Sequence, residues 1–204
     1  MVARILYFLE DRLQEGFIKA LVNRIAQDMS VPVGSLIHDV RSARGGSTVI
    51  PEFKRFMKDT AQTNPDEADL LVIAIDGNCR GRTARIRQLE KYISRNHPLR
   101  GKVVYAVPNP HIERWYMMDQ RAFKNGVGID KAPAMPAYKC RKDYYKSLLH
   151  QALAEANVGS MLGGVEYADN IVNNITSLDS LGSQNAGFKT FIDDLRAFFR
   201  ARAE

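Results

Sequence analysis

The chain has 204 residues, of which 45% are hydrophobic and 25% are charged, and its formal net charge is +6 at pH 7. This composition is typical of a globular protein, and the length suits one domain with at most a short helical addition. No apolar stretch reaches the roughly 18 residues of a membrane span, and the N-terminal residues lack a signal-peptide cleavage pattern, so we expect no membrane association. The positive charge favours a polyanionic partner.

The cysteine content limits the redox setting. Cys79 and Cys140 are the only cysteines, and their spacing matches no zinc motif. Two cysteines also do not make a disulfide framework, so the sequence predicts a reduced pair in a cytoplasmic protein. A disulfide between the two remains the less favoured alternative.

The first 120 residues alternate short apolar runs with stretches of helical periodicity. An apolar run predicts a strand over 3–9, and the spacing of Phe17, Ile18 and Leu21 predicts a helix over 13–29. The predicted order then continues with a strand at 35–40, a helix at 50–60, a strand at 70–75, a helix at 82–95, a strand at 102–107 and a short helix after Pro110.

This alternation predicts right-handed βαβ crossovers and an α/β fold with about four mainly parallel strands flanked by helices. The pattern changes after residue 119: residues 124–137 contain glycine and proline breaks, and helices are predicted at about 140–156, 161–178 and 186–202. We therefore divide the chain into an α/β core (1–125) and a helical C-terminal extension (126–204) that packs on this core.

Acidic side chains follow three of the predicted strands. Glu10 follows the first strand, Asp76 follows the third, and Glu113 begins the helix after the fourth. Carboxylates at the carboxyl ends of parallel strands line the crevice in which open α/β sheets bind ligands, and neighbouring strands lie about 4.8 Å apart. The sequence therefore predicts a Mg²⁺ or Mn²⁺ site with Glu10, Asp76 and Asn78 as ligands. Glu113 is predicted to be a further ligand or to orient a water molecule.

Basic residues are concentrated just after the second acidic cluster and around residue 140. Arg80, Arg82 and Arg85 belong to the first group, and Lys142 belongs to the second. We expect these four side chains to contact the phosphates of a nucleic acid. A solvated helix face is the alternative explanation for the arginines.

Ordinary structural roles compete with these assignments. A carboxylate after a strand is commonly a helix N-cap, and Asp76 also fits a simple turn. Trp115 and Tyr116 are better explained as core residues than as base-stacking groups, and His111 is a weaker candidate for a general base. The glycines at 45 and 46 lack the Gly-Lys-Ser/Thr ending of a phosphate-binding loop. The sequence contains no nucleophile elbow and no dinucleotide-binding fingerprint.

Four short segments, taken in order, resemble the Toprim family. Residues 9–18 (LEDRLQEGFI) resemble its opening V-E-G-x-T-E-x-x-F-I element, and residues 75–81 (IDGNCRG) resemble its D-x-D loop. Residues 107–119 (VPNPHIERWYMMD) are similar to the P-x-I-E-x-W-L-L-x-D segment of small stand-alone Toprim-like proteins, and residues 186–195 (AGFKTFIDDL) to their tail helix.

The resemblance implies a Toprim-like Rossmannoid fold with Mg²⁺ held by Glu10, Asp76 and Asn78. Toprim domains occur in topoisomerases, bacterial primases, recombination proteins and overcoming-lysogenization-defect nucleases. Small stand-alone members often accompany an ATPase of the ABC type in bacterial anti-phage defence, which implies such a partner here. Two departures matter: Asp11 replaces the usual glycine, and Asn78 replaces the second aspartate and removes one negative charge, which Glu113 can restore.

The leading hypothesis is therefore a Mg²⁺-dependent nuclease, the effector of an anti-phage system with an ATPase partner. The sequence leaves open whether the substrate is DNA or RNA, tRNA included. It also leaves open whether the protein forms a homodimer. The first alternative is a catalytically altered regulatory or binding subunit, consistent with Asn78. The second is a phosphotransfer or phosphatase domain with Asp76 as nucleophile.

Overall fold

The computed structural model describes residues 2–62, 68–141, 143–159 and 163–203. Its centre is a four-stranded sheet in the order β2-β1-β3-β4, in which every neighbouring pair is parallel. The strands are β1 (Ala3–Leu9), β2 (Leu36–Ser42), β3 (Leu70–Ala74) and β4 (Val103–Ala106). The predicted α/β Rossmannoid class is confirmed.

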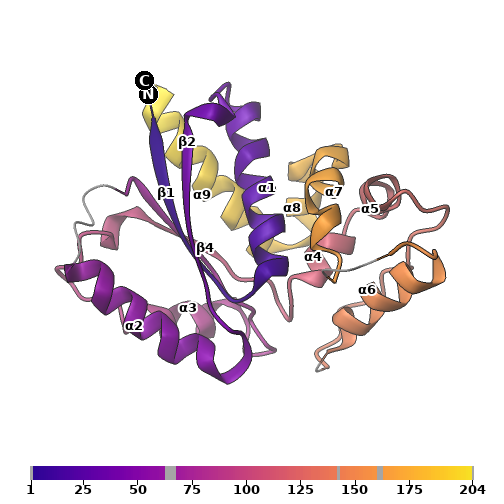
Figure 1. The fold of residues 1–204 in the computed structure, drawn as a ribbon, viewed down its shortest axis with the longest axis horizontal. Coiled ribbons are helices and arrows are strands. Elements are labelled where there is room, and N and C mark those ends of the chain that lie inside the picture. Colours follow the sequence, from indigo (N-terminus) through magenta and orange to yellow (C-terminus); the bar gives the residue numbers. More distant parts are fainter. Residues whose placement is uncertain (1, 63–67, 142, 160–162, 204) are drawn as a thin grey trace.

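Helices cover both faces of the sheet (Figure 1). On one face, α1 (Arg12–Asp28) packs beside the C-terminal helix α9 (Ala186–Ala203). On the other face lie α2 (Val49–Gln62) and α3 (Arg82–Glu90). Two hydrophobic cores result, because alternate side chains of β1 point to opposite faces: Tyr7 joins the core under α1, whereas Phe8 joins the core under α2.

The remaining helices gather on the α1 side of the sheet. They are α4 (Glu113–Met117), α5 (Gln120–Val127), α6 (Tyr144–Glu155), α7 (Ala168–Asn174) and α8 (Leu178–Gln184), with short 3₁₀ turns at Val33–Ser35, Gly46–Thr48, Arg100–Lys102 and Val165–Tyr167. Trp115 of α4 is 1% exposed, and its ring lies 5.1 Å from that of Phe188 and 6.0 Å from that of Phe191 on α9. The C-terminal helices therefore share one core with the sheet, and Trp115 and Tyr116 are core residues as predicted.

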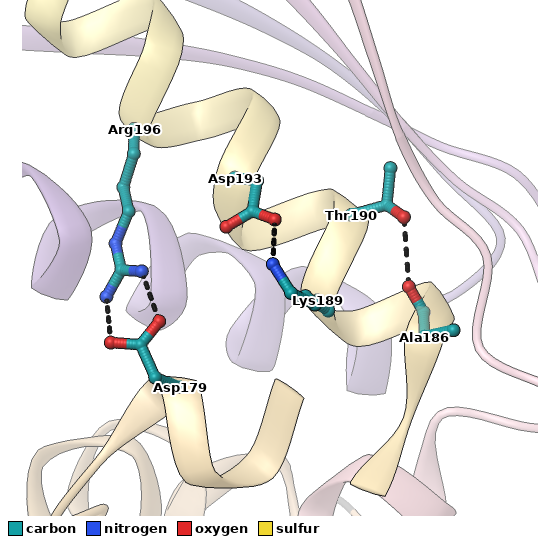
Figure 2. Close-up of polar contacts among 6 residues, drawn as sticks. All are labelled: Asp179, Ala186, Lys189, Thr190, Asp193 and Arg196. Atoms are coloured by element: carbon teal, nitrogen blue, oxygen red, sulfur yellow. Dashed lines mark hydrogen bonds and ion pairs between the residues drawn. The ribbon is translucent and has the colours of Figure 1, made fainter. Parts of the chain in front are cut away.

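Polar contacts join α8 to α9 at the surface (Figure 2). The Arg196 guanidinium of α9 donates a hydrogen bond from each terminal nitrogen to the Asp179 carboxylate of α8. Within α9, Lys189 pairs with Asp193, and the Thr190 hydroxyl donates to the Ala186 carbonyl at 2.9 Å. These ion pairs are largely exposed, so they orient the helices without contributing much stability.

Some predicted boundaries were wrong. The helix predicted over 82–95 ends at Glu90. Part of the irregular segment predicted at 124–137 is helical, because α5 continues to Val127 and ends at Gly128 in the left-handed conformation (φ +77°). The single helix predicted over 161–178 is α7 followed by a break at Ile175. No helix in the described ranges is long and apolar enough to cross a membrane.

The prediction of two reduced cysteines was also wrong. Cys79 and Cys140 form a disulfide, with their Cα atoms 5.5 Å apart at a sequence separation of 61. Sequence spacing was uninformative because the tertiary fold, not the chain separation, brings the two together.

Candidate metal centre at the carboxyl end of the sheet

The predicted acidic residues meet at the carboxyl edge of the sheet because β1 and β3 are parallel neighbours. Glu10 directly follows β1, and its backbone N–H donates to the Ala74 carbonyl at 3.0 Å, which continues the strand pairing. Asp76 lies two residues beyond β3. Glu113 is the first residue of α4. All three carboxylates line one cavity of about 960 Å³.

Hydrogen bonds fix two of these carboxylates relative to each other. The Asp76 backbone N–H donates to Glu10 Oε2 at 2.8 Å. Asp76 Oδ1 accepts from Gln14 Nε2 at 2.8 Å and from the Ile112 N–H at 3.1 Å. Gln14 Oε1 in turn accepts from the Glu10 N–H at 3.0 Å, so one amide side chain links both strand ends.

Gln14 is a site residue that sequence reasoning missed. It is fully buried at the start of α1, on the same helix face as Phe17, Ile18 and Leu21. The sequence did contain a signal for it: Gln14 is a polar residue on an otherwise apolar helix face. A buried amide needs hydrogen-bond partners, so its position indicates a buried polar contact.

The N-cap explanation for Glu10 is wrong, because Asp11 has that role. The Asp11 side chain accepts from the Gln14 N–H at 2.9 Å. The Asp11 backbone is extended (φ −156°, ψ −179°), a conformation that any residue adopts, so the usual glycine of the Toprim pattern is not required here.

The cavity disfavours the charged form of each carboxylate. Glu10, Asp76 and Glu113 are 8%, 7% and 5% exposed. Burial, followed by the negative charges of Glu10 and Glu113, raises the pKa of Asp76 well above its usual value. Burial likewise raises the pKa of Glu10, and it raises the pKa of Glu113 to about 7.

Glu113 also has a buried oxygen without a partner. Its Oε2 makes no hydrogen bond to any described residue. An unpaired carboxylate oxygen beside two further carboxylates is an arrangement that a bound cation would stabilise, since it offsets both the repulsion and the lost hydration.

The loop after Asp76 has an unusual backbone. Asn78 and Cys79 have positive φ angles of 46° and 66°. A Cβ at Gly77 would lie 2.8 Å from Asn109 Oδ1 and 3.1 Å from the Pro108 carbonyl oxygen, so the turn requires glycine. Asn78 is exposed and lines the cavity, but its amide nitrogen lies 3.5 Å from the Asp76 carbonyl oxygen, in a weak hydrogen bond.

The predicted nucleic-acid-binding residues are placed in different surroundings. Arg80 is exposed at the cavity. Arg85 is only 6% exposed, and its Nε donates to the Asp76 carbonyl at 2.9 Å, so it supports the loop. Arg82 lines a separate pocket next to α9. Lys142 lies outside the described residues. Lys146, which belongs to the second basic group of the sequence, also lines the cavity, as does Arg44, which sequence reasoning did not assign.

The carboxylates at the cavity provide part of the ligand set that a hard cation needs. In the described ranges, no group of three or more His, Cys, Asp or Glu side chains is arranged so that it could hold a metal ion by itself. Mg²⁺, however, is commonly held by one or two carboxylates and several waters, and does not need a full protein cage. Glu113 and the Glu10–Asp76 pair supply carboxylates, and the unpartnered Glu113 oxygen is the observation that fits a cation.

Comparison with known proteins assigns no family: no family model matches the chain, and no curated protein or solved structure is similar to it.

Proposed function

We propose that this protein is a Mg²⁺-dependent nuclease of the Toprim type. The observation that carries the proposal is the group of buried carboxylates, Glu10, Asp76 and Glu113, on one cavity at the carboxyl edge of the sheet. Glu10 and Asp76 would hold the ion together with the Asn78 amide oxygen, and Glu113 would act as a further ligand or orient a water. The bound cation would supply an activated water and neutralise charge on the scissile phosphate.

Cationic side chains at the cavity support a phosphate-rich substrate. Arg44, Arg80 and Lys146 line it together with the carboxylates. In this proposal they contact phosphate oxygens on either side of the scissile bond, so binding weakens as salt rises. Arg85 holds the Asp76 loop through the Asp76 carbonyl.

The biological context comes from the Toprim resemblance. We propose that the protein is a cytoplasmic effector in anti-phage defence and that an ABC-type ATPase partner controls its cutting. The proposed substrate is DNA or RNA, tRNA included. A cytoplasmic location is compatible with the disulfide, because disulfides in that compartment are usually transient and redox-sensing.

The second candidate function is a catalytically altered regulatory subunit. It is favoured by Asn78, whose side chain is exposed and lies near a backbone carbonyl, where it adds no negative charge to the cluster. In this case the protein binds nucleic acid without cutting it.

The test compares the wild-type protein with Glu10→Ala and Asp76→Ala, and uses Asp130→Ala, an exposed carboxylate outside the cavity, as the matched control. Plasmid, single-stranded DNA and tRNA are incubated with Mg²⁺ or Mn²⁺, and cation binding is measured by titration calorimetry. We expect the wild-type protein and the control to cut and to bind the cation, and the two site variants to do neither. Full cutting by a folded site variant would refute the nuclease assignment. Cation or nucleic-acid binding without cleavage would favour the regulatory subunit.

A further inference from the structure

The disulfide joins the candidate metal centre to a second part of the chain. Cys79 lies three residues after Asp76, in the loop whose residue Asn78 lines the cavity. Cys140 lies in residues 129–141, which contain no helix or strand and which we call the strap. The strap precedes α6, whose Lys146 lines the same cavity. The disulfide therefore links the loop that borders the cavity to a segment that leads into α6, another part of the cavity lining.

Main-chain hydrogen bonds anchor the first part of the Asp76 loop to the segment after β4, and the Arg80 N–H closes a turn on the Gly77 carbonyl at 2.9 Å. The Gly77 N–H donates to the Pro108 carbonyl at 2.7 Å, and the Asn78 N–H donates to the Pro110 carbonyl at 3.0 Å. Within the described residues, no main-chain hydrogen bond ties Cys79 itself to another segment, and the disulfide supplies that link. Asn78 and Cys79 both occupy the sparsely populated positive-φ region at the centre of this turn, so the disulfide adds to the turn hydrogen bond in holding them there.

The first part of the strap packs on the core through Ile129, Ala132 and Met135, whereas residues 136–141 around Cys140 are held by few contacts other than the disulfide. The Asn109 side-chain amide donates to the Tyr138 hydroxyl at 2.9 Å, and the Arg114 guanidinium lies 5.1 Å from the centre of the Tyr138 ring. The Lys139 N–H donates to the Tyr145 hydroxyl at 3.1 Å. Tyr138 is itself 47% exposed, so these contacts are weakly shielded from water. Loss of the disulfide would leave residues 136–141 loosely attached.

Both cysteines are open to a reductant. Cys79 and Cys140 are exposed, and the cationic residues Arg80, Lys139 and Arg141 are their sequence neighbours. Positive charge near a disulfide stabilises the thiolate that leaves when the bond is attacked. An accessible disulfide in a cationic setting is typical of regulatory pairs rather than of buried structural ones.

We propose that the Cys79–Cys140 pair is a redox control of the candidate metal centre, an inference that rests on the proposed function for its effect on the cation. A dithiol reductant supplies two electrons: one of its thiolates attacks a disulfide sulfur and displaces the other cysteine as a thiolate. Its second thiol then resolves the mixed disulfide, which leaves two protein thiols and the oxidised reductant. Reduction loosens the loop around Cys79 and residues 136–141 of the strap, and the cation is held less tightly.

The loss of Mg²⁺ affinity on reduction depends on the fraction of time that the loosened loop spends in its cation-binding geometry. If this fraction is about one tenth, the apparent dissociation constant for Mg²⁺ rises about tenfold.

The test uses the full-length protein, oxidised or reduced with dithiothreitol, and the Cys79→Ser/Cys140→Ser variant as the matched control. Amide hydrogen exchange is followed over residues 77–81 and 136–141, and Mg²⁺ affinity is measured by calorimetry. We expect reduction to speed exchange in both segments and to weaken Mg²⁺ binding about tenfold. The variant should resemble the reduced wild-type protein and should not respond to dithiothreitol.

The outcomes separate the two proposals. Unchanged exchange on reduction overturns the redox control. Faster exchange with unchanged Mg²⁺ affinity overturns its coupling to the metal centre. Absence of Mg²⁺ binding in both redox states overturns the proposed metal site instead, while the exchange data alone still decide whether the disulfide restrains the loop.

Discussion

Glu10 and Asp76, 66 residues apart, are joined through the main chain: the Asp76 N–H donates to Glu10 Oε2 at 2.8 Å. This hydrogen bond fixes the orientation of one carboxylate by the backbone of the other. Because it involves the backbone of Asp76, it survives replacement of the Asp76 side chain. The charge of this side chain can therefore be removed while the geometry of its neighbour is kept.

The first prediction concerns Asp76→Asn. The asparagine oxygen can still accept from Gln14 and from the Ile112 N–H, while the charge that burial and neighbouring carboxylates disfavour is removed. We expect the metal-free variant to be more stable than the wild-type protein at pH 7 and to lose Mg²⁺ binding. Urea unfolding and calorimetry measure the two effects, with Asp130→Asn as the exposed control. A variant that is less stable yet still binds Mg²⁺ would contradict the prediction.

The second prediction concerns pH. The pKa of Glu113 rises from 4.5 to about 7 on folding, so between these values the folded state holds a proton that the unfolded state has released. The resulting stability is complete below pH 4.5 and is lost as pH rises through about 7. A shift of this size corresponds to about 3 kcal/mol. We expect the unfolding free energy of the wild-type protein to fall more between pH 5 and pH 8 than that of Glu113→Gln, by about this amount. Equal pH dependence in urea unfolding would exclude a raised pKa at Glu113.

Cation binding should show the opposite pH dependence, because the cation requires the deprotonated carboxylate. Mg²⁺ affinity is expected to rise with pH through about 7, the pKa of Glu113. The same titration on Glu113→Gln should be flatter.

The third prediction concerns Gln14. Replacement by alanine removes two buried hydrogen bonds, while the Glu10 N–H keeps the Ala74 carbonyl and Asp76 Oδ1 keeps the Ile112 N–H. We expect a loss of about 2 kcal/mol in unfolding free energy and weaker Mg²⁺ binding. Gln27→Ala, an exposed position on the same helix, should change neither quantity. Unfolding by urea with and without Mg²⁺ makes the comparison.

The fourth prediction separates two neighbouring arginines. Arg80 is exposed at the cavity, so Arg80→Ala should weaken oligonucleotide binding, lower its salt dependence by about one phosphate contact and leave stability unchanged. Arg85→Ala should lower stability, because the Asp76 carbonyl loses its buried donor. Binding measured across a salt series, together with urea unfolding, tests both. Arg87→Ala, exposed on the same helix as Arg85, is the control. Equal effects of Arg80→Ala and Arg85→Ala on binding and on stability would show that the two arginines do not have these separate roles.

The fifth prediction concerns stability and the disulfide. Closing a loop of 61 residues restricts the unfolded chain, which the loop-entropy relation equates with about 4 kcal/mol. We expect Cys79→Ser/Cys140→Ser to lower the unfolding free energy by roughly this amount under oxidising conditions. Under reducing conditions the variant and the wild-type protein should be alike. A difference that persists in dithiothreitol would indicate that serine itself perturbs the site.

The sequence by itself determined the strands of the sheet and the positions at which acidic residues follow them. The apolar run at β3 is a strong signal because a strand buried on both faces is apolar throughout, and β1 is apolar from Ile5 to Leu9. Glu10 and Asp76 had to lie near one edge, since parallel strands end on the same side. Element ends were less predictable: α5, for instance, continues through a stretch where Gly126 fits against Ile171 of α7, a contact that no local pattern encodes.

Only the tertiary structure decided which side chains complete the site. Gln14 and Arg85 act through hydrogen bonds to groups 62 and nine residues away, and neither partner is visible in local sequence. The pairing of Cys79 with Cys140 likewise depends on where the strap crosses the Asp76 loop. Periodicity reports which face of an element is buried, whereas hydrogen bonds and disulfides depend on distances that exist only after the elements have packed.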